Sequence, residues 1–178
     1  MTKSKSDIRR AAKSAVKALT AQQKADKSTL ILSCIASSES IKSAKTVALY
    51  ASLSDEVQSF ELIEFLSQTK RVVLPRVAGD DMDFYPYTPS SLKVGAFGIE
   101  EPQGSEPISP DEIDVIVVPG VAFTTDGKRC GRGKGYYDKY LSRSGFRAIK
   151  IGVCYAEQLA EDIPNEPHDI VMDYMIYG

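Results

Sequence analysis

The stretch that decides the fold is residues 119–138, which read PGVAFTTDGKRCGRGKGYYD. Residues 114–118 (DVIVV) come directly before it, and a short β-branched apolar run of this kind is typical of a strand buried in a parallel sheet. Pro119 and Gly120 end that strand, because proline has no N–H to donate to a ladder and glycine tolerates any turn. We therefore predict a strand, then a polar loop, then a helix over about 136–141.

This loop combines glycine with positive charge, and both suit phosphate binding. Residues without a Cβ let backbone N–H groups approach phosphate oxygens closely, and the N-terminus of the following helix adds partial positive charge. Arginine and lysine side chains add full charges at the same place. The loop contains Gly127, Gly131, Gly133 and Gly135, interspersed with Lys128, Arg129, Arg132 and Lys134.

The spacing of these residues excludes the two commonest phosphate-binding motifs. A P-loop requires G-x-x-x-x-G-K-[ST], but Lys134 is followed by Gly135 and lies outside that frame. A dinucleotide fingerprint requires G-x-G-x-x-G, whereas residues 131–135 read G-x-G-x-G. A flexible basic surface loop is the alternative for any single glycine. The Tyr-Tyr-Asp at 136–138 favours a built site for the block as a whole.

The composition is that of an ordinary globular protein with one domain. The chain has 178 residues, of which 43% are hydrophobic and 26% are charged. No apolar run approaches the roughly 20 residues that span a bilayer, and the basic N-terminus lacks the apolar core of a secretory signal. The three cysteines form no paired motif. Reduced thiols and a cytoplasmic location are therefore expected.

Charge is distributed unevenly along the chain, although the net charge is only −2. Residues 1–27 hold eight basic and two acidic residues, and residues 128–150 hold eight basic and one acidic. These two basic islands are net +6 and +7, so the remaining residues sum to −15. This pattern favours an anionic small-molecule site built from two segments over a nucleic-acid-binding protein. An RNA-binding module that uses both islands is the alternative.

Two helices are predicted at the N-terminus. Lys5 and Arg9 are four residues apart on the first helix, so they lie one turn from each other and are able to address one anion together. A solvated basic face is the alternative interpretation. Thr20 and Gln23 form a capping box for a second helix that runs to about Ser37. The apolar positions are Ile8, Ala11, Ala12, Ala15, Val16 and Leu19 on the first helix, and Leu30, Ile31, Cys34 and Ile35 facing inward on the second.

Short apolar runs predict strands that alternate with helices. This alternation indicates a mostly parallel sheet with helices on both faces. Ligands bind beyond the carboxyl ends of the strands in such sheets, so the loop at 54–56 and the loop at 119–138 are expected to face one cleft. The expected strands are 46–51, 72–74 (stopped by Pro75), 82–87, 114–118, 148–154 and 170–176, with a helix capped by Ser59 that places Phe60, Ile63, Phe65 and Leu66 at apolar positions.

The run 119–141, PGVAFTTDGKRCGRGKGYYDKYL, closely resembles the signature of the 5-formyltetrahydrofolate cyclo-ligase family, also called 5,10-methenyltetrahydrofolate synthetases. Residues 50–56 (YASLSDE), 97–102 (FGIEEP, otherwise a turn) and 163–169 (IPNEPHD) resemble further family elements. The resemblance implies a single domain over 1–178 with a three-layer α/β/α fold of the NagB/RpiA/CoA-transferase-like type. It also implies ATP-dependent cyclisation of 5-formyltetrahydrofolate to 5,10-methenyltetrahydrofolate, with Mg²⁺ as cofactor.

The resemblance also assigns roles to residues. Glu56 matches the glutamate that meets the folate, and a carboxylate suits the row of N–H donors on a pterin. Asp138 and Asp169 match the magnesium ligands, and their oxygens suit that ion. The implied ATP-binding residues are Lys5, Arg9, Arg129, Cys130, Gly131, Arg132, Gly133, Lys134, Gly135, Tyr136 and Tyr137. The implied folate-binding residues are Ala51, Glu56, Arg132, Gly133, Lys134, Gly135 and Tyr136, and the catalytic ones are Arg132, Lys134 and Tyr136.

The chain departs from the family pattern at a few positions. Ala51 replaces a bulkier apolar residue, Thr124-Thr125 replaces a commonly acidic start to the loop, and Cys130 replaces an aliphatic residue. Cys130 lies close to two arginines, so a lowered thiol pKa is a hypothesis. His168 is the single histidine, which excludes a metal cluster built on several histidines. On its own it favours a structural role, as Asp169 alone favours a strand cap.

Two function classes therefore remain beside the cyclo-ligase. One is a different ATP-using enzyme on the same scaffold, and the other is the RNA-binding module. The expected partners are small molecules, 5-formyltetrahydrofolate and ATP, with no nucleic acid and no membrane. The expected assembly is a monomer or a weak homodimer.

Overall fold

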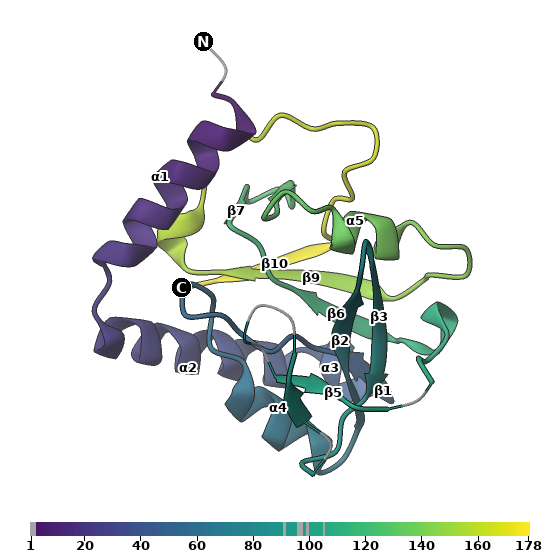
Figure 1. Ribbon diagram of the computed structural model, residues 1–178. Helices are drawn as coiled ribbons and strands as arrows, with labels where there is room; N and C mark the ends of the chain where they lie inside the picture. The colour runs from purple at the N-terminus through teal and green to yellow at the C-terminus, as the bar shows by residue number, and fades with distance from the viewer. Residues whose placement is uncertain (1–2, 91, 96–97, 99, 105) are drawn as a thin grey trace.

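A six-stranded sheet forms the centre of the molecule in the computed structural model (Figure 1). The structure describes residues 3–90, 92–95, 98, 100–104 and 106–178. All neighbouring strands of the sheet are parallel except β2 and β3, which confirms the mostly parallel arrangement. In spatial order the strands are β10 (Tyr174–Tyr177), β9 (Ile149–Cys154), β6 (Val115–Val118), β1 (Thr46–Ala48), β2 (Arg71–Ala78) and β3 (Asp81–Pro86).

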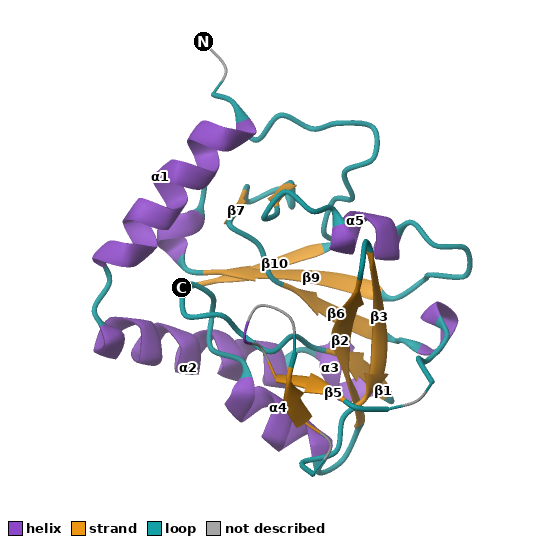
Figure 2. Ribbon diagram, viewed as in Figure 1, coloured by secondary structure: helices purple, strands orange, loops and turns teal. Residues whose placement is uncertain are grey.

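Helices cover both faces of this sheet, which confirms the three-layer α/β/α fold (Figure 2). On one face lie α2 (Ala21–Ser37), α3 (Glu39–Ser43) and α4 (Phe60–Ser67). The other face is covered by α5 (Tyr136–Leu141). The first helix, α1 (Lys5–Ala18), contacts the short strands β7 (Ala122–Phe123) and β8 (Arg129–Cys130) and the turn η3 (Ala156–Gln158). In the described part of the chain, no helix is long and apolar enough to cross a bilayer.

The central strand β6 shows why the sheet has two hydrophobic cores. Side chains alternate between the faces of a strand. Val115 and Val117 accordingly belong to the core under α2 to α4, and Ile116 and Val118 to the core under α5. All four residues are buried. A strand covered on both faces has no solvent side, so its sequence is continuously apolar.

Side chains cap the first two helices, and the capping box predicted for the second is confirmed. Ser4 caps α1, and Thr20 and Gln23 form both hydrogen bonds of the capping box of α2. The inward face predicted for α2 is half wrong. Ile31 and Ile35 are buried, but Leu30 is 66% exposed and Cys34 is exposed. Leu30 and Cys34 have the same spacing of four residues as Ile31 and Ile35, so the apolar periodicity alone did not decide which of these two pairs faces the sheet.

Pro75 does not stop β2 as predicted, because the strand continues to Ala78. The carbonyl of Val73 accepts the N–H of Leu49 on the β1 side, and the N–H of Val77 points the same way, toward the carboxylate of Glu101. Alternate residues of a strand direct their N–H groups to the same side, so Pro75 also faces that side. There β1 has already ended, and no ladder bond is lost.

Several boundaries and connections differ from the sequence-based expectation. β1 ends at Ala48 rather than Ala51, and β10 begins at Tyr174 rather than Ile170. Ser59 precedes α4, but its hydroxyl donates to the carbonyl of Tyr50 instead of capping the helix. The predicted turn at 97–102 is partly wrong. Residues 97 and 99 lie outside the described residues, and Glu100–Pro102 form β5, which pairs with β4 (Leu92–Val94).

Gly127 is expected to be the most substitution-sensitive position of the β7–β8 turn. Its φ is +92°, and an added Cβ would lie 2.6 Å from the carbonyl oxygen of Met172. Left-handed backbone costs roughly 1–2 kcal/mol for an alanine, and such a close contact about 1–3 kcal/mol more. We expect Gly127→Ala to lower the free energy of unfolding in urea by about 2–5 kcal/mol.

Gly79→Ala is the matched control for Gly127→Ala. Gly79 also has a positive φ, +62°, but nothing lies within 4 Å of its added Cβ. Only the backbone term of roughly 1–2 kcal/mol should appear. Equal losses in the two variants would contradict the close approach of Gly127 to Met172.

Candidate active site

The loop at 119–135 lies beyond the carboxyl end of β6, where the sequence predicted a ligand site. Its first half forms a small hairpin, in which β7 pairs with β8. Its second half turns at Gly133 and Gly135, whose φ values of +104° and +71° strongly favour glycine. Gly135 is also the N-cap residue of α5. The glycines therefore form a compact bend between the hairpin and the helix.

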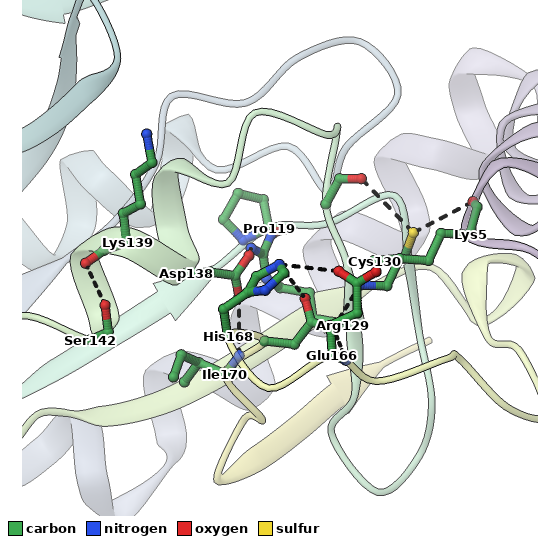
Figure 3. A network of polar contacts seen from close by, with 12 residues as sticks. Lys5, Pro119, Arg129, Cys130, Asp138, Lys139, Ser142, Glu166, His168 and Ile170 are labelled. Carbon is green, nitrogen blue, oxygen red and sulfur yellow. Dashed lines mark hydrogen bonds and ion pairs between the residues drawn. The ribbon is translucent and has the colours of Figure 1, made fainter.

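Arg129 and Asp138 form a buried ion pair beneath this bend (Figure 3). The Arg129 side chain is only 5% exposed. Its Nη2 lies 2.9 Å from Asp138 Oδ2, and its Nη1 donates to the carbonyl of Pro119 at 3.2 Å. The guanidinium carbon lies 5.4 Å from the centre of the Tyr137 ring. The charge of Arg129 is therefore directed inward to the strand end and to α5.

Arg132 connects the glycine bend to the loop after β1. Its Nη2 lies 2.6 Å from Asp55 Oδ1 and 2.9 Å from Glu56 Oε1, and its Nη1 lies 3.2 Å from Asp55 Oδ2. These contacts confirm that the loops at 54–56 and 119–138 lie side by side beyond the strand ends, as predicted. The Arg132 side chain remains 35% exposed.

Glu56 is a buried acceptor at the edge of this contact. It is 7% exposed, and its Oε2 accepts the N–H of Leu53 at 3.0 Å. Burial raises the pKa of Glu56, and the hydrogen bonds from Leu53 and Arg132 offset only part of this effect. Burial, and then the nearby charge of Glu56, raise the pKa of Tyr137, whose hydroxyl therefore stays protonated. Ala51 is buried at the start of the same loop.

Two cations of α1 reach the same region. Arg9 Nε donates to the carbonyl of Gly131 at 2.7 Å. Lys5 Nζ lies 2.6 Å from Asp169 Oδ2 and 3.3 Å from Glu166 Oε2. Burial alone would raise the pKa of Asp169, but the hydrogen bonds from Lys5 and from the N–H of Glu166 outweigh it and lower the pKa. The basic face of α1 is therefore joined to the bend and to the 166–169 segment.

The two carboxylates implied as metal ligands lie on adjoining segments. The peptide N–H between Asp169 and Ile170 donates to Asp138 Oδ1 at 3.1 Å. Asp138 contacts Arg129, and Asp169 contacts Lys5, so each carboxylate already has a cationic partner. Carboxylate oxygens are the donors that Mg²⁺ prefers, and the pair therefore fits such an ion in kind.

The remaining predicted residues lie around the bend in different ways. Lys134 is exposed between the two glycines, and Tyr136 donates its hydroxyl to the carbonyl of Gly79 at 3.1 Å. His168 is 72% exposed, and its Nε2 lies 3.1 Å from Glu166 Oε2. Glu166, His168 and Asp169 form a group near the surface whose possible metal-ligand atoms lie within 4.8 Å of one another.

The hypothesis of a lowered Cys130 pKa is wrong. Cys130 is buried in a small core that includes Ile8 and Ala12 of α1. Burial raises the pKa of the thiol, and the charges of Arg9, Lys5 and Arg129 do not offset it. The strand pairing of Cys130 with Ala122 turns the sulfur into this core, which the neighbouring arginines in the sequence did not reveal.

The family model of 5-formyltetrahydrofolate cyclo-ligases matches residues 1–178. The chain belongs to the 5-formyltetrahydrofolate cyclo-ligase family. A cyclo-ligase from Saccharomyces cerevisiae is 33% identical over 96% of this chain and 93% of its own. The NMR structure of Aquifex aeolicus 5,10-methenyltetrahydrofolate synthetase has a TM-score of 0.88 at 36% identity, and covers 97% of this chain and 89% of its own. The Mycoplasma pneumoniae synthetase has a TM-score of 0.78 at 28% identity, and covers 97% of both chains.

Three residues at the site of this cyclo-ligase family member had no role predicted from the sequence. Asp55 shares Arg132 with Glu56, and its position next to Glu56 was an available signal. Tyr155 and Gln158 contact the two loops through backbone carbonyls. Such contacts leave no mark in the sequence, because any residue supplies a carbonyl oxygen.

Lys5→Met is expected to destabilise the protein in a pH-dependent way. The lowered pKa of Asp169 means that its contribution to stability is fully present above its ordinary value of 3.8, and is lost as the pH falls through the lower folded value. Loss of Lys5 should therefore cost about 1–2 kcal/mol at neutral pH, because the pair is partly solvated, and less in acid. Urea unfolding at several pH values measures this difference.

Lys3→Met is the control for Lys5→Met, because Lys3 is an exposed lysine of the same segment. It should leave the free energy of unfolding unchanged at every pH. If the loss caused by Lys5→Met were the same at acid and neutral pH, the contact with Asp169 would not be its cause.

Proposed function

We propose that this protein closes the ring of 5-formyltetrahydrofolate to give 5,10-methenyltetrahydrofolate, with hydrolysis of ATP to ADP and phosphate. The observation that carries the proposal is the contact of Arg132 with Glu56 across the two loops. It brings a cation of the glycine bend next to the buried carboxylate that matches the folate-binding position of the family. One site that holds a triphosphate beside a pterin is what this reaction requires.

On the ATP side, charge and backbone donors support phosphate binding. Arg132 and Lys134 lie in the glycine bend and are at least partly exposed, and Arg9 contacts the bend at Gly131. The glycine N–H groups and the start of α5 add partial positive charge. Arg129 is buried, so we assign it the task of supporting the bend rather than meeting the nucleotide from solvent.

On the folate side, Glu56 supplies the acceptor. An ionised carboxylate accepts hydrogen bonds only, and the N–H and amino groups of a pterin form a matching row of donors. Release of Arg132 from Glu56 would free Oε1 for those donors, while Asp55 still holds the guanidinium. Ala51 and the ring of Tyr137 would offer apolar surface to the ligand.

The chemistry needs activation of a poor leaving group. Transfer of the γ-phosphoryl group to the formyl oxygen releases ADP and makes that oxygen a good leaving group. N10 then attacks the formyl carbon, the carbon–oxygen bond breaks with loss of phosphate, and N10 loses its proton. The protein contributes orientation and positive charge, with Arg132 and Lys134 stabilising charge on the transferred group.

Asp138 and Asp169 are the residues that would hold Mg²⁺. When bound, the ion neutralises negative charge on the phosphate oxygens of ATP. Arg129 and Lys5 would keep the two carboxylates oriented, since each donates to one of them.

An absorbance assay on the purified protein tests the proposal. The conjugated methenyl product should appear only when 5-formyltetrahydrofolate, ATP and Mg²⁺ are all present, and omission of any one should abolish it. ATP turnover with another carboxylate or amide, and none with 5-formyltetrahydrofolate, would instead identify a different ATP-using enzyme on this scaffold.

Removal of either exposed cation of the bend should slow the reaction. We expect Arg132→Ala and Lys134→Ala each to lower kcat/KM at least ~10²-fold, the scale of losing one preorganised donor in a transition state. Lys128→Ala is the control, because Lys128 lies in the same loop but pairs with Asp162 on the surface. Unchanged rates for both Arg132→Ala and Lys134→Ala would remove the bend from the ATP site.

Glu56→Gln should affect folate more than ATP. We expect a KM for 5-formyltetrahydrofolate raised by about tenfold, because the neutral amide loses a charged acceptor, and a KM for ATP that changes little. The acceptor form of Glu56 exists above its pKa, which burial raises from 4.5. The KM of the wild type for 5-formyltetrahydrofolate should therefore rise as the pH falls toward this raised pKa. In Glu56→Gln the same KM should depend less on pH. Equal effects on both substrates would move Glu56 away from the pterin.

A further inference from the structure

We infer that residues 155–158 form a brace that positions both halves of the active site, with Tyr155 holding the folate-side loop and Gln158 holding the start of the ATP-side loop. The inference rests on the proposed function, because it names positioning residues for that reaction. The brace follows β9 directly and includes the turn η3. Tyr155 and Gln158 are both buried.

Tyr155 contacts the backbone of the residue that supplies the folate-side carboxylate. Its hydroxyl donates to the carbonyl of Glu56 at 2.9 Å and lies 3.1 Å from the hydroxyl of Ser28 on α2. Ser28 in turn accepts the N–H of Gln58 at 3.0 Å. The side-chain amide of Gln58 donates to the same Glu56 carbonyl at 2.8 Å. The carbonyl of Glu56 thus accepts from two donors: Gln58 belongs to the same loop, and Tyr155 follows the sheet strand β9.

Gln158 contacts the other loop at the point where it leaves the sheet. Its Nε2 donates to the carbonyls of Gly120 and Val121, both at 3.0 Å. Arg129 donates to the carbonyl of Pro119 beside them. Both amide hydrogens of Gln158 are therefore used to fix the first residues of the loop that bears the glycine bend.

The two ends of the brace are joined to each other. The N–H of Tyr155 donates to Oε1 of Gln158 at 2.9 Å. Tyr155, which contacts Glu56, therefore also fixes the side chain of Gln158, which contacts Gly120. This turn therefore fixes the position of the Glu56 carbonyl relative to the carbonyls of Gly120 and Val121. The reaction needs the formyl oxygen and the γ-phosphoryl group in close register, and small misplacements of such groups cost rate.

The contacts at the two ends differ in their targets, so each is removable without the other. Tyr155→Phe removes only the hydroxyl that reaches Glu56. Gln158→Met removes the donors to Gly120 and Val121, and also the acceptor of the Tyr155 N–H, with a side chain of similar size. It leaves the hydroxyl of Tyr155 in place on the carbonyl of Glu56. Tyr140→Phe is the matched control, because Tyr140 is also a fully buried tyrosine but its hydroxyl has no hydrogen-bond partner within the described residues.

Steady-state kinetics with both substrates tests the inference. We expect Tyr155→Phe to raise the KM for 5-formyltetrahydrofolate about fivefold and the KM for ATP less than about twofold, the scale of losing one neutral hydrogen bond. Gln158→Met should do the converse, about fivefold or more on ATP and little on folate. Tyr140→Phe should change neither. Equal effects on both substrates in both variants, or no effect in either, would overturn the inference.

Hydrogen exchange of the same variants provides a readout that does not depend on turnover. Tyr155→Phe should speed amide exchange within residues 53–58 and leave 119–123 unchanged, and Gln158→Met should show the reverse. If each variant changed the exchange rates equally in both loops, Tyr155 and Gln158 would act only through general core packing, and the inference would be wrong. If the wild type made no methenyl product, the proposed function would fail, while the exchange pattern would still decide on the brace.

Second variants serve if either substitution prevents folding. Ser28→Ala removes the hydroxyl beside Tyr155, and should shift the folate KM alone. Gln158→Leu removes the same polar contacts with an uncharged side chain of similar size, and should shift the ATP KM alone. Any other pattern counts against the inference.

Discussion

The architecture of the site depends on an ion pair that is largely buried, with the side chain of Arg129 5% exposed and that of Asp138 16% exposed. Arg129 lies under the glycine bend with Asp138 as its ionic partner, and the carbonyl of Pro119 accepts a further hydrogen bond. A buried charge is costly unless it is paired and hydrogen-bonded, so the strand end and α5 must stay where these partners meet. An added Cβ at Gly131 would lie 2.9 Å from Arg129 Nη1, so this glycine makes room for the guanidinium.

The other arginines at the bend have different partners. Arg132 contacts Asp55 and Glu56 in the loop after β1, and Arg9 of α1 donates to the carbonyl of Gly131. Arg129 thus supports the loop from within, while Arg132 joins it to the loop after β1. Residues of both basic islands of the sequence therefore meet at one site, where carboxylates pair with Lys5, Arg129 and Arg132.

Much of the scaffold was predictable because it follows from local chemistry. The cap of α2, the start of α5 at Tyr136 and the buried strand at 115–118 were all confirmed. The errors arose where a segment distant in the sequence changed the outcome expected from a local rule. Pro75 was expected to end its strand, but β1 had already ended beside it. Cys130 was expected to be ionisable, but helix α1 covers it.

By itself, the sequence determined the order of the six strands of the main sheet and of helices α1, α2, α4 and α5, the position of the glycine bend, and the residue types available for binding phosphate and folate. Periodicity, caps and glycine spacing are local properties, so they are recognisable without knowing which other segments pack against them. Only the tertiary structure decided which arginine is buried and which faces Glu56, and which carbonyls Tyr155 and Gln158 hold. Burial and pairing depend on segments that are far apart in the chain, such as Glu56 and Tyr155 at a separation of 99 residues and Lys5 and Asp169 at 164, and no pattern within one segment encodes them.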